Sequence, residues 1–162
     1  MSFRERLRID TEAGTTHDVD VRYMMIRPDA LMGIFARLSP PAREEAMQAF
    51  KASIVERGGH SAANYVERHG TEALLGVIEA TAADLGWGRW RFSQDEAGLT
   101  LQVENSPFAE GATFDGPVCH PIAGMCEVVG GLFLRGAVDV RETACARVSG
   151  GDCAFRMELK PT

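Results

Sequence analysis

The sequence predicts one α+β domain in which helices come first and an antiparallel sheet follows. Apolar residues recur at helical spacing through residues 28–85. Residues 87–103 and 137–159 instead alternate between apolar and polar side chains around turn-forming residues, as strands do. Helices followed by strands are typical of the α+β class. The length of 162 residues suits a single core, so we expect one domain over residues 1–162, with polar residues 1–17 flexible.

The first half of the chain predicts one strand and four helices. Residues 18–27 begin with the alternation of a strand. Pro28 suits the first turn of a helix, and the helices that follow are expected over 28–38, 40–57, 61–69 and 71–85. Gly58-Gly59 is expected to separate the second helix from the third, and Gly86 to end the fourth.

The second half predicts two pairs of strands around one buried helix. Residues 87–92 and 99–103 form the first pair, and a loop rich in glycine and proline follows over 105–117. Residues 120–134 are apolar, and Gly124, Gly130 and Gly131 would let a neighbour pack close to that helix. The last pair, 137–148 and 153–159, is expected to be a hairpin around Ser149-Gly150-Gly151-Asp152.

Charge and composition exclude several classes of function. The formal net charge is -6 and the isoelectric point is about 5.2, which disfavours binding to nucleic acid phosphates or to an anionic membrane surface. The start of the chain has no apolar run of the secretory kind, and no stretch is long enough to span a bilayer. We therefore expect a cytoplasmic protein whose cysteines remain reduced.

Four residues of the last third have the chemistry of a metal site: Cys119, Glu142, Cys145 and Cys153. Thiolates and a carboxylate suit tetrahedral zinc, and four protein ligands make a structural site that contributes to folding. The spacing alone leaves two interpretations open, because buried cysteines also serve as small apolar core residues. It also leaves His120 and Cys126 open as alternative ligands.

Several aromatic, histidine and methionine side chains are candidates for the wall of a ligand pocket, although each of them also suits an ordinary core or surface position. The candidates are His60, Tyr65, Trp87, Trp90, Phe92, Phe108, His120, Met125 and Phe133. No catalytic residue is assigned, because the chain has neither a glycine-rich dinucleotide fingerprint nor a nucleophile constellation. An enzymatic role is accordingly not predicted from the residues.

The segments 116–119, 141–145 and 151–155, together with the glycine-bearing helix between them, resemble the 4-vinyl reductase domain family. This family includes bacteriochlorophyll-synthesis proteins and the sensor domains of phenol-responsive activators. The resemblance is firm over residues 105–159. Over residues 18–85 it depends on the order of elements and on the small residues Gly59-His60-Ser61-Ala62-Ala63.

The resemblance implies a fold related to a vesicle-tethering subunit, often dimeric, with a ligand pocket between helices and sheet. It also implies that Cys119, Glu142, Cys145 and Cys153 hold one structural zinc, although iron remains an alternative. The leading hypothesis is a stand-alone sensor, carrier or accessory protein that binds a hydrophobic, aromatic or tetrapyrrole-like molecule. The alternatives are an enzyme or enzyme subunit that reduces a vinyl group in bacteriochlorophyll synthesis, and a protein-interaction scaffold.

Overall fold

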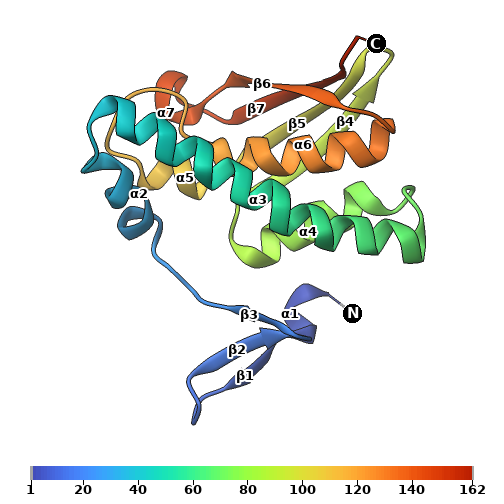
Figure 1. Ribbon diagram of the computed structural model, residues 1–162, viewed down its shortest axis with the longest axis horizontal. Helices are drawn as coiled ribbons and strands as arrows, with labels where there is room; N and C mark the ends of the chain where they lie inside the picture. Colours follow the sequence, from blue (N-terminus) through green and yellow to red (C-terminus); the bar gives the residue numbers. More distant parts are fainter. Residues whose placement is uncertain (1, 162) are drawn as a thin grey trace.

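The computed structural model describes residues 2–161, which form a four-stranded antiparallel sheet covered by helices, and a small N-terminal sheet (Figure 1). The helices are α1 (Phe3–Arg6), α2 (Pro28–Ala36), α3 (Pro40–His69), α4 (Leu74–Leu85), α5 (Pro107–Gly111), α6 (His120–Leu134) and α7 (Ala146–Ser149). The strands are β1 (Arg8–Asp10), β2 (Thr15–Asp18), β3 (Val21–Tyr23), β4 (Arg89–Asp95), β5 (Gly98–Glu104), β6 (Val138–Ala144) and β7 (Cys153–Leu159). The predicted α+β class is confirmed.

The larger sheet has the order β4-β5-β7-β6, and every neighbouring pair is antiparallel. Helix α6 packs on this sheet and also against α3, which makes it the centre of the domain. Gly130 allows the close approach to the sheet, because a Cβ there would lie 3.3 Å from the side chain of Met157 on β7. The core therefore sits between α6 and the inner face of β5 and β7, where Leu99, Leu101 and Phe155 are fully buried.

Helix α3 is one continuous helix, so the predicted break at Gly58-Gly59 is wrong. Glycine in a helix interior costs roughly 1 kcal/mol relative to alanine, which is why the pair predicted a boundary. Here both glycines face α6. A Cβ on Gly58 would lie 2.7 Å from Sδ of Met125, and one on Gly59 would lie 3.4 Å from Val128. The pair thus serves close helix packing and does not end the helix.

The N-terminal segment differs from the prediction. Residues 1–17 were expected to form a flexible terminus, but residues 3–17 contain α1, β1 and most of β2. The strand expected over 18–27 is shorter, because Val19 turns the chain with a positive φ of 53° and only Val21–Tyr23 pairs with β2. Residues 24–27 then run without regular structure to α2, and Met24 and Met25 are 80% and 100% exposed.

The second half of the chain follows the sequence more closely. Strands β4, β5 and β7 and helix α6 are found close to where they were predicted. The strand predicted over 137–148 is shorter, because β6 ends at Ala144 and α7 begins at Ala146. The loop expected over 105–117 contains the one-turn helix α5, and the hairpin connection contains α7. Within residues 2–161, no helix combines the length and the apolar character that crossing a membrane requires.

Candidate metal centre and ligand cavity

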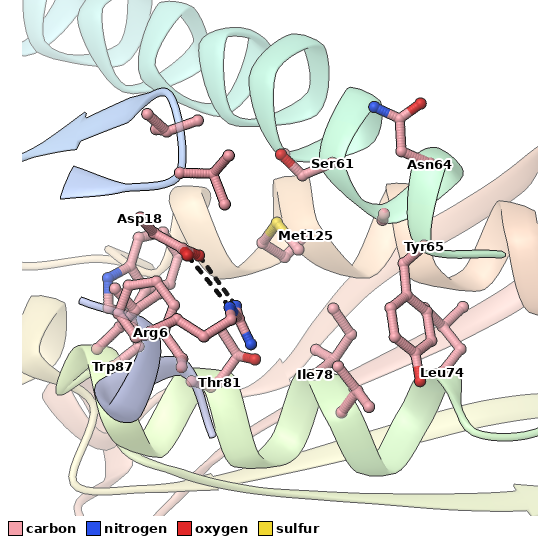
Figure 2. A pocket seen from close by; sticks show the side chains of 18 of the residues that line it. Arg6, Asp18, Ser61, Asn64, Tyr65, Leu74, Ile78, Thr81, Trp87 and Met125 are labelled. Atoms are coloured by element: carbon pink, nitrogen blue, oxygen red, sulfur yellow. Dashed lines mark hydrogen bonds and ion pairs between the residues drawn. The ribbon is translucent and has the colours of Figure 1, made fainter. Parts of the chain in front are cut away.

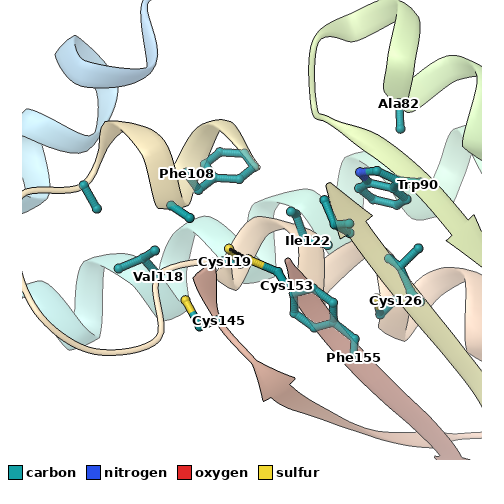
Figure 3. Packing of buried hydrophobic residues seen from close by; sticks show 14 of the residues in the cluster. Ala82, Trp90, Phe108, Val118, Cys119, Ile122, Cys126, Cys145, Cys153 and Phe155 are labelled. Carbon is teal, nitrogen blue, oxygen red and sulfur yellow. Dashed lines mark hydrogen bonds between the residues drawn. The ribbon is translucent and has the colours of Figure 1, made fainter. Parts of the chain in front are cut away.

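Cys119, Glu142, Cys145 and Cys153 gather at one end of the larger sheet. One potential ligand atom from each lies within 4.8 Å of all the others. The three cysteines are buried, with exposures of 0%, 5% and 0%, and Glu142 is half-buried. Figure 3 shows Cys119 and Cys153 side by side, with Cys145 facing them from the start of α7. The fold therefore brings together four residues that are separated by up to 34 positions in the sequence.

Local backbone features bring these side chains to one point. Cys119 is the N-cap residue of α6, and Cys153 begins β7. A register shift between Glu142 and Ala144 ends the regular pairing of β6, so that Cys145 turns inward as the N-cap of α7. The positive φ angles of Gly150 (71°) and Gly151 (74°) then fold the chain back onto Cys153.

The thiols form a hydrogen-bonded group. The Sγ atoms of Cys119 and Cys153 lie 3.4 Å apart, and the backbone N–H of Ala146 donates to Sγ of Cys153 at 3.3 Å. The hydrogen bond from Cys119 lowers the pKa of Cys153 to about 7, whereas the same shared proton, together with burial, raises the pKa of Cys119. Cys153 is thus the thiol that most readily becomes a thiolate, the form that binds metals.

Glu142 carries a buried acceptor that finds no partner. Its Oε1 has no hydrogen bond within the described chain, and burial raises the pKa of its carboxyl group. An unpartnered buried carboxylate oxygen is costly unless a cation or donor satisfies it. A cation among the three sulfur atoms would supply that partner.

The spacing of the sulfur atoms fits a metal better than a disulfide. A disulfide needs about 2.05 Å between sulfurs, much less than the 3.4 Å between Cys119 and Cys153. Two thiolates bound to tetrahedral zinc at about 2.3 Å lie about 3.8 Å apart. The donor set of three sulfurs and one carboxylate oxygen therefore forms a group that could hold a metal ion.

The two alternative ligands lie outside this group. Cys126 lies farther along α6 and is fully buried, beyond Phe155 in Figure 3. Burial raises the pKa of its thiol. His120 points toward α3, where its Nε2 lies 3.7 Å from Oε1 of Glu44, and burial lowers its pKa. Sequence analysis did not include Ser106, whose hydroxyl lies 3.2 Å from Sγ of Cys119 and which is itself 3% exposed.

A cavity of about 900 Å³ opens between α3, α4 and the N-terminal sheet. Four predicted pocket residues line it: Tyr65, Trp87, Trp90 and Met125. Figure 2 shows Met125 reaching in from α6, with Tyr65 and Trp87 toward opposite ends of the space. Tyr65 packs against His69 with ring centroids 4.8 Å apart and the rings tilted by 40°. The indole N–H of Trp90 donates to the carbonyl of Trp87 at 3.0 Å.

The other five pocket candidates do not line this cavity. His60 is exposed on α3, and His120 lies against Glu44. Phe108 is buried on α5, with its ring centroid 5.2 Å from that of Trp87, so it supports the cavity wall from behind. Phe92 and Phe133 are half-buried and pack against the core.

Most residues of the cavity wall were not predicted from the sequence. Seven lining residues belong to the N-terminal segment that was expected to be flexible or extended, namely Phe3, Arg6, Asp18, Val19, Asp20, Val21 and Tyr23. A run of small residues on α3 (Gly58, Ser61, Ala62) also lines it. These residues recur at helical spacing, and a stripe of small residues leaves room where larger ones would fill the core. That pattern was the available indication of a cavity.

Residues 99–159 of the chain match the model of the V4R domain. This segment is similar to the V4R domain. The predicted resemblance to the 4-vinyl reductase domain family is confirmed. The matched residues include all four residues of the candidate metal centre. A search of curated protein sequences finds no match.

Solved structures of similar fold cover more of the chain than the matched segment does. The phenol-responsive sensory domain of the transcription activator PoxR with phenol has a TM-score of 0.74 and 16% identity, covering 97% of this chain and 86% of that one. Subunit 3 of the trafficking protein particle complex from Naegleria fowleri, covalently bound to palmitic acid, has a TM-score of 0.56 and 12% identity, covering 83% and 95%. A vinyl-4-reductase family protein from Methanocaldococcus jannaschii has a TM-score of 0.53 and 14% identity, covering 86% and 98%. The predicted relation to a vesicle-tethering subunit fold is confirmed.

Proposed function

We propose that this V4R-domain protein is a small-molecule-binding protein, a sensor, carrier or accessory factor, whose fold is braced by a zinc ion. The observation that carries the proposal is the cavity of about 900 Å³ between α3, α4 and the N-terminal sheet. Ligand pockets commonly enclose roughly 300–1,000 Å³ and combine apolar walls with a few polar groups. The PoxR sensory domain, which has a similar fold, was solved with phenol.

The walls favour a hydrophobic molecule with aromatic character. Leu74, Val77 and Ile78 of α4 form one side. Trp87, Trp90 and Tyr65 supply aromatic faces and edges, against which flat rings pack favourably. A single phenol ring would occupy a small part of this volume, so a polycyclic or tetrapyrrole-like molecule is the larger ligand that the space admits.

We assign zinc to Cys119, Glu142, Cys145 and Cys153. Three soft thiolates favour zinc over magnesium or calcium, and four protein ligands leave no open position for catalysis. The ion would join the start of α6 to the β6–β7 connection and satisfy the buried oxygen of Glu142. A cytoplasmic location would keep the thiols reduced and available for this role.

We also propose that two copies of this protein form a homodimer. Ile9, Val21, Met24, Met25 and Ile26 expose large apolar side chains on and beside the N-terminal sheet. Apolar surface of this kind is typical of protein–protein contacts. Sedimentation of the native protein at several concentrations tests it, and a monomer at every concentration would contradict it.

Native mass spectrometry of the protein purified from its own host tests the function. We expect one zinc per chain and an organic molecule retained by the folded protein. The variant Ile78→Trp, which fills the cavity from α4, should keep the zinc and lose the organic molecule. A ligand that remains bound to Ile78→Trp, or a native protein that binds nothing from a panel of phenols and porphyrins, would overturn the proposal.

A further inference from the structure

The cavity face of α3 changes in character along the helix. Ile54 and Gly58 line it near the middle of the helix, Ser61 and Tyr65 follow, and Arg68 lies at the C-terminal end. These positions are three or four residues apart, so their side chains share one face of the helix. An apolar wall therefore ends in a polar and cationic mouth.

Arg68 differs from the other arginines and the lysine of α3 because its guanidinium group has no partner among residues 2–161. Arg43 donates to the carbonyl of Phe35 at 3.0 Å, Lys51 pairs with Glu127 at 3.0 Å, and Arg57 pairs with Glu56 at 3.1 Å. The side chain of Arg68 forms no hydrogen bond or ion pair with any residue between 2 and 161. A guanidinium group at the edge of an apolar cavity is thus left available for a ligand.

The end of the cavity opposite Arg68 has no unpaired positive charge among the residues described below. Arg6 pairs with Asp18 through two hydrogen bonds of 3.1 Å and 2.9 Å, so these two charges neutralise each other. Figure 2 shows this pair beside Trp87 and Thr81, away from Tyr65 and Leu74. Asp20, on the turn beside Asp18, adds an acidic group at this end. An anionic group in the cavity is therefore favoured at the Arg68 end and repelled at the other.

We propose that the ligand of this cavity is an amphipathic acid, a hydrophobic ring system or chain bearing a carboxylate or another anionic group that pairs with Arg68. The proposal rests on the function proposed above and adds to it the class of ligand and a residue that determines specificity. Arginine suits this role because its planar guanidinium can donate two parallel hydrogen bonds to one carboxylate. The apolar part of the molecule would extend toward Met125 and Trp87.

Two fluorescent probes that differ by one anionic group test the idea. N-phenyl-1-naphthylamine is neutral, and 1-anilinonaphthalene-8-sulfonate has the same ring system with an added sulfonate. We expect the full-length protein to bind the sulfonate at least about tenfold more tightly at low salt, and the difference to shrink as salt screens the charge. Ile78→Trp should weaken the binding of both probes, which would show that they occupy the cavity.

Arg68→Gln and Arg57→Gln form a matched pair of variants. Both remove one positive charge from an exposed position on α3, but only Arg68 lines the cavity. We expect Arg68→Gln to lose the preference for the sulfonate, a change of about tenfold, with unchanged binding of the neutral probe. Arg57→Gln should behave as the unaltered protein does.

The outcomes separate this inference from the function on which it rests. Equal affinity for the two probes, or a preference that survives Arg68→Gln, overturns the anionic ligand and leaves the binding function standing. An equal loss in Arg57→Gln also overturns it, because the effect would then come from net charge. Failure of both probes to bind the cavity contradicts the proposed function itself.

Discussion

The candidate metal centre and the cavity differ in how completely their space is filled. At the end of the larger sheet, Cys119, Cys145 and Cys153 are buried and in mutual contact. Between α3, α4 and the N-terminal sheet, a cavity of about 900 Å³ stays open. A filled site fixes one arrangement, whereas an open one admits ligands of different shape. We infer that the filled region maintains the fold and that the open region determines which ligand binds.

The largest expected effect comes from removing a thiol of the filled region. Cys153→Ser should lose the metal and lower the free energy of unfolding by about 3–5 kcal/mol, since a structural metal stabilises the fold directly. Metal content by elemental analysis and unfolding in urea measure both quantities. The control is Cys126→Ala, which also removes a buried thiol but lies outside the group, and should keep the metal at a cost of about 1–2 kcal/mol. If Cys153→Ser retains metal and stability, the filled region is ordinary core.

An intermediate effect distinguishes two glycines at the contact between α3 and α6. A Cβ on Gly124 would lie 2.9 Å from the backbone carbonyl oxygen of Lys51, which cannot move without moving α3. We expect Gly124→Ala to lower the free energy of unfolding by about 2–3 kcal/mol. The only close contact of a Cβ on Gly58 is with Sδ of Met125 at 2.7 Å, and its other neighbours lie at 3.8 Å or more. Met125 has a flexible side chain that can shift toward the cavity.

Gly58→Ala is therefore the matched variant on the cavity side. The gain of roughly 1 kcal/mol in helix propensity should offset the displacement of Met125, so that stability stays within about 1 kcal/mol. Affinity for N-phenyl-1-naphthylamine should fall several-fold, because the displaced side chain occupies ligand space. Calorimetric melting and fluorescence titration check the two expectations, and equal destabilisation by both alanines would remove the distinction between the regions.

The smallest expected effect lies at the β4–β5 turn, in neither region. Asp95 accepts hydrogen bonds from Arg156 at 2.7 Å and 2.8 Å, and these bonds lower the pKa of its carboxyl group to about 2. A lowered folded-state pKa contributes stability above the ordinary value of 3.8 that is lost as pH falls toward about 2. Asp95→Asn should flatten the pH dependence of the urea midpoint in that window. An unchanged pH profile would show that this exposed pair contributes nothing measurable.

The sequence predicted the filled region far better than the open one. Cysteine and glutamate carry their chemistry in their identity, and the turn at Gly150-Gly151 indicated how Cys153 returns to Cys145. Gly124 and Gly130 likewise predicted close packing on α6, although not the partners, Lys51 and Met157. Such partners depend on tertiary geometry that local patterns do not encode.

The cavity could not be predicted in the same way, because it is defined by what is missing between elements. Its walls come from α3, α4, α6 and an N-terminal segment that looked flexible from its polarity. Tyr65 and Trp90 were named as candidates because they are aromatic, yet Phe92 and Phe108 are also aromatic and do not line the cavity. Arg68 was not singled out, since only the pairing of its neighbours shows that it is free of partners within residues 2–161.

The length of α3 has a mechanical consequence. At 1.5 Å per residue, its 30 residues extend for about 45 Å, from α2 to the mouth of the cavity. Near its start, Arg43 donates to the carbonyls of Phe35 and Leu38 and stacks on Phe114. If this helix moves as a rigid rod, a tilt of about 3° around its middle shifts each end by about 1 Å. A displacement at the end of α3 held by Arg43 would then be accompanied by a displacement of similar size at the mouth of the cavity.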